Sequence, residues 1–131
     1  MKIAVITDDS KTISAHFGRA QYYAVFTITD NRVTDRELRP KANHRQFAGE
    51  GHGHSHSGEH GTDPAAEQRH NAMIESISDC QIVIARGMGT GAHRSLLAGR
   101  IHPIITDVEN IEEALNAYLS GSLTDHPEKL H

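Results

Sequence analysis

A short apolar run that leads directly into three closely spaced glycines is the feature that most constrains this fold. Residues 82–85 read Ile-Val-Ile-Ala and are bounded by polar residues, which is typical of a strand buried on both faces. Gly87, Gly89 and Gly91 follow, and then a helical pattern covers 92–98. A strand, a glycine turn and a helix in this order leave backbone N–H groups unpaired, the usual seat of an anion. We therefore expect this turn to form one wall of a ligand site.

Strand and helix patterns alternate around this unit. Apolar or β-branched runs predict strands at 2–7, 22–29, 33–38, 82–85 and 101–106. Apolar residues at helical spacing predict helices at 64–78, 92–98 and 107–118. Tight turns favour antiparallel pairing among the first three strands, whereas the later strand–helix–strand half requires parallel strands and a right-handed crossover. The sequence thus predicts an α/β fold with a mixed five-stranded sheet, in the order strand–strand–strand–helix–strand–helix–strand–helix.

A single domain accounts for the patterned part of the chain. The 131 residues suffice for an ordinary core, so we expect one domain over 1–122 and a flexible tail over 123–131. Between about residues 40 and 63 the apolar pattern is interrupted, and Phe47 is the only large apolar residue there. Such a segment buries too little apolar surface to offset its ordering entropy, so we expect a mobile insertion.

Charge and cysteine content exclude several classes of function. Lys and Arg number 13 against 17 Asp and Glu, without a basic stripe, which disfavours a nucleic-acid partner. Cys80 is the only cysteine, so an intrachain disulfide and a four-cysteine metal site are excluded, and we expect a packed apolar side chain. No apolar run approaches the roughly 20 residues of a membrane span, and the start lacks a signal-peptide pattern. We expect a cytoplasmic protein without a membrane partner.

Histidines are concentrated in the predicted insertion. The chain has 11 histidines, and the candidate metal ligands among them are His44, His52, His54, His56 and His60. Neutral imidazole binds divalent transition metals, and alternation with small residues lets the chain fold around an ion. The insertion lacks the closely spaced, commonly cysteine-containing pairs of an ordered zinc site. Two interpretations stay open: a metal-binding loop, or a solvated linker whose histidines are incidental.

The glycine turn also matches the dinucleotide-binding fingerprint G-x-G-x-x-G/A. Gly87, Gly89 and Ala92 fit the pattern, and Asp107 lies 20 residues beyond Gly87. Too little chain follows for a second mononucleotide-binding half. A turn that lets strand and helix pack closely explains the glycines at least as well.

The polar segment after the first strand contains two further candidates. Asp8 and Asp9 could hold Mg²⁺ for nucleic-acid cleavage, but turn formation explains them better because partner carboxylates and basic residues are lacking. His16 is expected in a loop at the carboxyl end of a central strand, where it can reach a ligand. The alternative is an exposed loop histidine beside a buried Phe17.

Several short motifs occur in an order typical of one known family. They are Ile-Ala-Val-Ile-Thr at 3–7, His-Phe-Gly-Arg-Ala at 16–20, Ile-Ser-Asp-Cys-Gln-Ile-Val-Ile at 77–84, Gly-Met-Gly at 87–89 and the run 96–104. With these motifs the chain resembles the dinitrogenase iron–molybdenum cofactor biosynthesis family, the NifX- and NifB-C-terminal-like domains. The match covers nearly the whole chain except the histidine-rich segment and the tail.

The resemblance implies a ribonuclease-H-like, three-layer α/β fold and a non-catalytic role connected with nitrogen fixation. The protein would bind, shield or hand over an iron–sulfur or iron–molybdenum-type cluster or its precursor, with cofactor-biosynthesis proteins as partners. The chain lacks the cysteine pairs that hold a permanent iron–sulfur cluster. By position, the resemblance assigns cofactor binding to His16, Phe17, Gly18, Arg19, Gly87, Met88, Gly89, Thr90 and Gly91.

Three functions follow from these observations. The first is a carrier whose cluster lies between the His16 loop and the glycine turn. The second is a divalent-metal buffering or delivery protein that acts through the histidine-rich loop. The third is an enzyme, either one that binds a nucleotide at the glycine turn or an Mg²⁺ nuclease.

Overall fold

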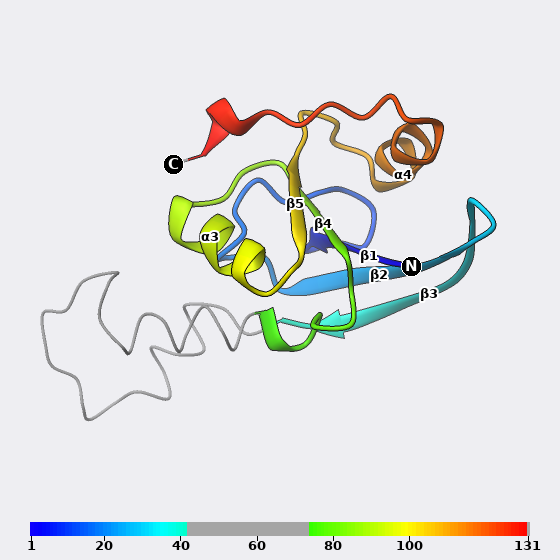
Figure 1. The fold of residues 1–131 in the computed structure, drawn as a ribbon, viewed down its shortest axis with the longest axis horizontal. Coiled ribbons are helices and arrows are strands. Elements are labelled where there is room, and N and C mark those ends of the chain that lie inside the picture. Colours follow the sequence, from blue (N-terminus) through cyan, green and yellow to red (C-terminus); the bar gives the residue numbers. More distant parts are fainter. Residues whose placement is uncertain (42–73, 131) are drawn as a thin grey trace, which may run out of the picture.

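A mixed five-stranded sheet organises the part of the chain that the structure describes, residues 1–41 and 74–130 of a computed structural model (Figure 1). Its strands are β1 (Lys2–Thr7), β2 (Tyr22–Thr29), β3 (Arg32–Pro40), β4 (Ile82–Ala85) and β5 (His102–Ile105). They lie in the order β3-β2-β1-β4-β5. β1 is antiparallel to β2 and parallel to β4, β2 is antiparallel to β3, and β4 is parallel to β5. The expected mixed α/β sheet is confirmed.

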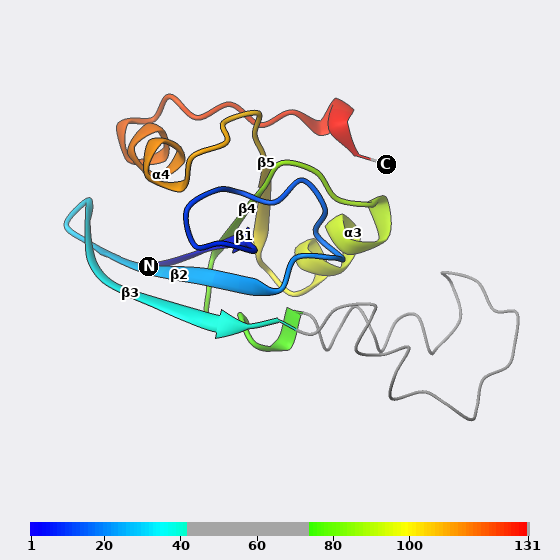
Figure 2. The same cartoon turned by 180° about the vertical axis from the view of Figure 1, so that it is seen from behind.

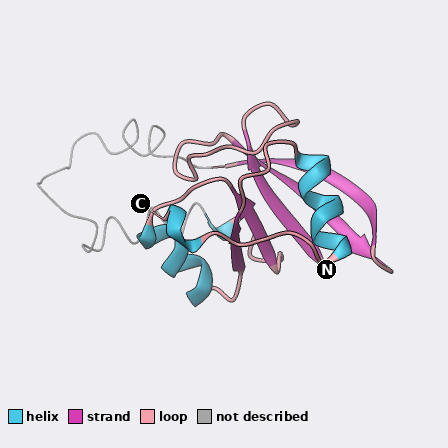
Figure 3. Cartoon of the chain, turned by 90° about the horizontal axis from the view of Figure 1, so that it is seen from above, coloured by secondary structure: helices cyan, strands magenta, loops and turns pink. Residues whose placement is uncertain are grey.

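The two strands at the centre of the sheet are buried on both faces. Ile3 to Ile6 in β1 have no exposed surface, and all of β4 is buried. Helices α3 (Thr90–Ala98) and α4 (Ile111–Ser120) cover opposite faces (Figures 1 and 3). Burial on both faces explains why these strands are continuous apolar runs without alternation.

The ends of α4 follow from local residues. The Asn110 side chain accepts the Glu113 N–H at 3.0 Å, and Gly121 ends the helix at φ 80°, a left-handed conformation that glycine adopts without strain. The helix therefore begins after Asn110, later than the expected start at residue 107. Of the helix expected over 64–78, residues 64–73 lie outside the described part, and residues 74 and 75 are helical. No helix in the described part has the length and hydropathy of a membrane span.

β3 is an edge strand whose side chains are exposed almost throughout. Its charged residues tie it to the layers on both faces. Arg36 lies over the Phe26 ring at 5.2 Å and forms an ion pair with Glu112 of α4 at 3.2 Å. Arg39 forms an ion pair with Asp79 at 2.8 Å. A charged edge strand of this kind resists pairing with other chains.

The segment after α4 returns across the molecule and crosses the carboxyl end of β5 (Figures 1 and 2). The Ile105 N–H donates to Asp125 Oδ1 at 2.9 Å, and the His126 N–H donates to the Ile105 carbonyl at 2.8 Å. Further on, Leu130 pairs with Met88 in an isolated bridge. A flexible tail over residues 123–131 stays a prediction. Within the described part of this segment, Leu123 and Leu130 pack against the core.

Candidate functional site

The carboxyl ends of β1 and β4 form the natural position for a ligand in this sheet. These two strands are parallel neighbours. The chain leaves β1 toward β2 on one side and leaves β4 toward α3 and β5 on the other. Open α/β sheets bind ligands where the connections of adjacent strands diverge in this way. We call this position the β1–β4 crevice; the loop of residues 8–21 and the turn of residues 86–89 border it.

One backbone hydrogen bond ties the loop after β1 to β1 itself, and two more place it alongside the end of β4. Ser14 N–H donates to the Ile6 carbonyl at 2.9 Å, and the Arg86 N–H donates to the Ser14 carbonyl at 3.0 Å. The Phe17 N–H donates to the Gly87 carbonyl at 3.2 Å. The His16 loop and the glycine turn, which are separated by some 70 residues in sequence, are therefore direct neighbours.

His16 is exposed, and its position is set by its neighbours in the chain. Its carbonyl accepts the N–H groups of Arg19 and Ala20, both at 3.0 Å, which closes a single turn. Phe17 is only 2 % exposed, and its ring lies 6.3 Å from that of Tyr23. Phe17 thus anchors the loop in the core, while the adjacent imidazole is free to meet a ligand. Arg19 is exposed and Gly18 is half-buried in the same turn.

The glycine turn leaves the start of α3 uncapped and open. Met88 is 1 % exposed and fixes the turn to the core. Gly89 is the N-cap of α3, and neither a capping side chain nor an acidic residue in the first turn accompanies it. Among the described residues, a Cβ atom built on Gly89 would meet nothing within 4 Å, so the backbone is open at this point of the turn. The N–H groups of Thr90 and Gly91 lie in this first turn, where a helix favours negative charge.

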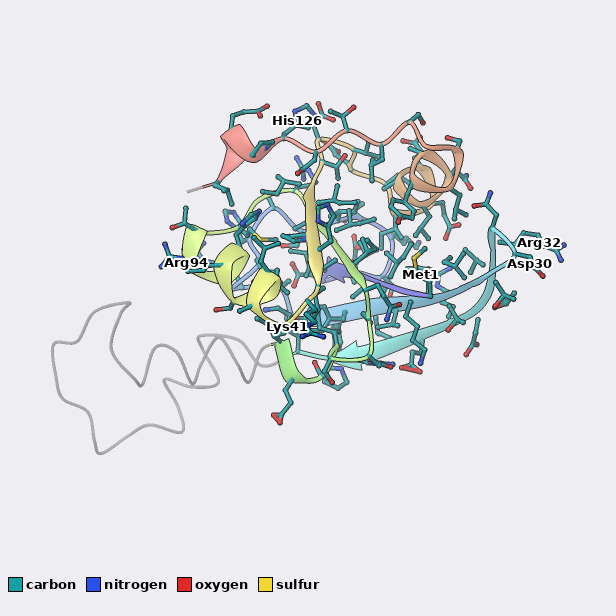
Figure 4. The ribbon with its side chains drawn as sticks, in the orientation of Figure 1. Met1, Asp30, Arg32, Lys41, Arg94 and His126 are labelled. Atoms are coloured by element: carbon teal, nitrogen blue, oxygen red, sulfur yellow. The ribbon has the colours of Figure 1, made fainter. Side chains whose placement is uncertain are left out.

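Lys41 is a residue of this region that the sequence analysis missed. It is 1 % exposed, and its ammonium group donates to the Ala20 carbonyl at 3.3 Å (Figure 4). The Nζ atom lies 4.8 Å from the centre of the Phe17 ring and 5.9 Å from that of Tyr23. Burial lowers the pKa of Lys41 to about 8. A lysine that follows Pro40 at a strand end carries no sequence signal for burial.

The aspartates after β1 organise the loop. Oδ1 of Asp9 accepts the N–H groups of Thr12 at 2.8 Å and Lys11 at 2.9 Å, and these bonds hold the pKa of Asp9 well below its usual range. Asp8 accepts the Gln21 N–H at 2.9 Å. Both carboxylates are thus engaged in shaping the turn, which supports the structural interpretation of Asp8 and Asp9.

The Asp-Cys pair before β4 is part of the framework. The Arg39 guanidinium donates to both carboxylate oxygens of Asp79, at 2.8 and 3.0 Å, and Lys2 donates at 3.1 Å. This ion pair with Arg39 keeps the pKa of Asp79 well below its usual range. Cys80 is buried, and burial raises the pKa of its thiol to about 12, so it packs as expected.

The candidate metal ligands of the histidine-rich insertion lie outside the described residues: His44, His52, His54, His56 and His60. Within residues 1–41 and 74–130, no three His, Cys, Asp or Glu side chains are grouped to hold a metal ion. In the β1–β4 crevice, the described part of the chain offers an exposed imidazole and an uncapped helix start. Such a set suits a ligand that is held by few protein contacts.

Comparison with known proteins gives a consistent result. The sequence model of the dinitrogenase iron-molybdenum cofactor family matches residues 1–121. NifX of Sinorhizobium fredii is 25% identical over 117 residues, covering 88% of this chain and 66% of that protein. NifX of Herbaspirillum seropedicae is 27% identical over 117 residues, covering 88% and 69%. The chain thus spans about two thirds of the length of the curated relatives it matches.

A solved structure shares the fold. The crystal structure of PH0822 aligns with a TM-score of 0.69 and 18% identity, covering 98% of both chains. At this identity the likeness concerns the arrangement of strands and helices alone. The sequence match is the stronger finding, because it extends from the start of β1 to the end of α4. On that match, this chain belongs to the dinitrogenase iron-molybdenum cofactor family.

Proposed function

We propose that this chain is a non-catalytic carrier that binds an iron–sulfur or iron–molybdenum-type cluster, or its precursor, and hands it to other proteins of cofactor biosynthesis. One observation carries the proposal. The exposed His16 lies in a loop that is hydrogen-bonded to the glycine turn, at the point where the connections that follow β1 and β4 diverge. The family to which the chain belongs, and its relatives named NifX, support the same role.

The crevice suits a cluster that must be bound and later released. The His16 imidazole would supply one ligand to iron or molybdenum, because a neutral imidazole nitrogen is a common ligand of transition metals. The first N–H groups of α3 would meet sulfides or a bound organic acid, whose negative charge suits a helix start. The anchored Phe17 and Met88 keep both walls in position before the cargo arrives.

The proposal extends to the architecture and the location. The strand order β3-β2-β1-β4-β5, with helices on both faces, supports a ribonuclease-H-like, three-layer fold with residues 1–122 as one domain. Location in the cytoplasm stays a prediction of the sequence.

Anaerobic reconstitution with an iron–sulfur or iron–molybdenum cluster tests the role of His16. We expect the wild type to gain visible absorption and bound metal, and His16→Ala to lose most of both. His102→Ala is a matched control, because His102 is an exposed histidine at the start of β5, at the opposite end of the sheet. Equal spectra and equal metal content in the wild type and His16→Ala would show that His16 has no such role.

Divalent-metal buffering or delivery is a second candidate function. The observation that favours it is the concentration of histidines between residues 44 and 60. In this function the histidine-rich segment binds the ion, and the sheet domain serves as its scaffold.

A further inference from the structure

Arg86 is the first residue of the glycine-turn wall of the β1–β4 crevice, and its backbone is bonded to the opposite wall. It follows β4 directly and precedes Gly87 of the glycine turn. Its N–H donates to the Ser14 carbonyl at 3.0 Å, two residues before His16. The loop before α4 closes the third side, where the Ile13 N–H donates to the Glu109 carbonyl at 2.8 Å. Arg86 is therefore the cationic residue at the junction of three loops.

The guanidinium of Arg86 is poorly satisfied in this position. Its Nε is buried and has no hydrogen-bond partner among residues 1–41 and 74–130. Its Nη2 lies 3.7 Å from Oε2 of Glu109, which is beyond hydrogen-bond distance, and the Glu109 side chain is 73% exposed. A buried donor without a partner is unfavourable, and an ion pair with a solvated carboxylate compensates little.

The unpaired Nε and the long contact with Glu109 point to a ligand for the guanidinium. An arginine presents five N–H groups in a planar fork that matches anionic oxygen or sulfur atoms, and ligands that accept from it bind more tightly than through a neutral donor. The Arg86 side chain is 34% exposed, so part of the fork is accessible from solvent. Glu109 is the carboxylate that forms an ion pair with the Arg86 guanidinium. An incoming anion would compete with Glu109 for that guanidinium.

We propose that Arg86 is the anion-binding residue of the β1–β4 crevice, with sulfide or oxygen atoms of the cargo replacing Glu109 as the partner of its guanidinium. This inference rests on the proposed carrier function and adds the side chain that meets the negative charge of the cargo. Glu109 then acts as an internal counter-ion that weakens binding until the anion displaces it.

Binding of tetrathiomolybdate, a sulfide-bearing molybdenum dianion, tests the inference by equilibrium dialysis with detection of its visible absorbance. We expect Arg86→Gln to weaken binding about tenfold or more, since it removes a charge-assisted contact. Arg86→Lys, which keeps the charge without the fork, should be intermediate. Glu109→Gln should tighten binding, because the competing carboxylate is lost.

The control for net charge is Arg32→Gln. Arg32 lies in the β2–β3 turn region, at the end of the sheet opposite to the crevice (Figure 4). The Arg32→Gln substitution removes the same charge as Arg86→Gln and should leave the affinity for tetrathiomolybdate unchanged. Far-ultraviolet circular dichroism identifies any variant that does not fold; if Arg86→Gln fails this check, Arg86→Lys and Glu109→Gln still decide the matter.

The outcomes separate this inference from the carrier proposal. Unchanged affinity in Arg86→Gln, or no tightening in Glu109→Gln, overturns the role of Arg86, and so does a wild type that does not bind the dianion. If cluster uptake still depends on His16 in such a case, the carrier function stands without it. If His16→Ala is also without effect on cluster uptake, both proposals fail.

Discussion

Lys41 places an ammonium group in the protein interior, directly behind the loop that presents His16. The Ala20 carbonyl and the faces of Phe17 and Tyr23 surround it. Aromatic faces and a carbonyl partly replace the water that the cation loses on burial. The lowered pKa of about 8 shows that the replacement is incomplete. Lys41 thus contacts the loop, but burial of its charged amine lowers the free energy of unfolding by an amount that depends on pH.

This dependence gives a prediction for Lys41→Met. The unfolded chain holds the Lys41 proton up to its ordinary pKa of 10.5, whereas the folded protein releases it at about 8. Between these values the unfolded state binds more protons, so the stability contributed by this group rises with pH. The free energy of unfolding of the wild type minus that of Lys41→Met should therefore rise between pH 8 and 10.5, by at most about 3 kcal/mol.

Urea unfolding at several pH values measures this difference, and the subtraction cancels the titration of Cys80 and Tyr23, which is common to both proteins. Lys11→Met, at an exposed lysine in the neighbouring turn, is the control and should give a flat difference. A flat profile for Lys41→Met as well would contradict the burial of the charged amine.

At the scale of elements, the segment after α4 pairs with the carboxyl end of β5. β5 is a four-residue strand with β4 on one side. On its other side Asp125 and His126 pair with the N–H and carbonyl of Ile105. The His126 imidazole in turn lies 2.9 Å from Glu128 and 3.9 Å from Asp107. The end of β5 at Ile105 is thus paired on both sides, and the segment continues to Met88 at the glycine turn.

Asp125→Ala tests this pairing. The substitution leaves the buried Ile105 N–H without its acceptor, and we expect the free energy of unfolding to fall by about 1–2 kcal/mol. The urea midpoint should decrease with an unchanged slope. Thr124→Ala, one residue earlier and exposed, is the matched control. If the two variants have the same midpoint, the bond from Asp125 to β5 contributes nothing to stability.

At the scale of the whole molecule, the two candidate functions belong to different parts of the chain. The crevice lies at the carboxyl end of β1 and β4, whereas the histidine-rich run belongs to residues 42–73, outside the described part. Cluster binding and divalent-metal binding should therefore be separable by mutation.

Deletion of residues 49–61 removes four of the five candidate histidines, all except His44, and tests this separation. We expect Ni²⁺ and Zn²⁺ binding in calorimetry to be lost, while the melting temperature and cluster uptake stay the same, since the crevice residues and the core are intact. A variant with alanine at His52, His54 and His56 keeps the length of the segment and should also lose most divalent-metal binding. Stoichiometric binding by the deletion protein would exclude the histidine-rich segment as the metal site.

Several elements followed from the sequence because their causes are local. The buried runs of β1 and β4 are apolar without interruption. The glycines of the turn between β4 and α3 lie next to these elements in the sequence, so the turn could be predicted from neighbouring residues. The Asp9 turn and the packed Cys80 were predicted on the same basis. The start of α4 was predicted too early, at residue 107, although its cap is local: the Asn110 side chain accepts the Glu113 N–H, and Asn110 is a residue type that favours this position.

The sequence by itself thus determined the class of fold, the central strands and the glycine turn, since apolar periodicity and glycine chemistry act over a few neighbouring residues. Only the tertiary structure decided which segments meet: the Ser14–Arg86 pairing, the burial of Lys41, the surroundings of the Arg86 Nε and the contact of residues 125 and 126 with β5. These depend on strand order and register, which bring together residues far apart in the chain. No local pattern carries that information, because the free energy of each contact arises from its partner.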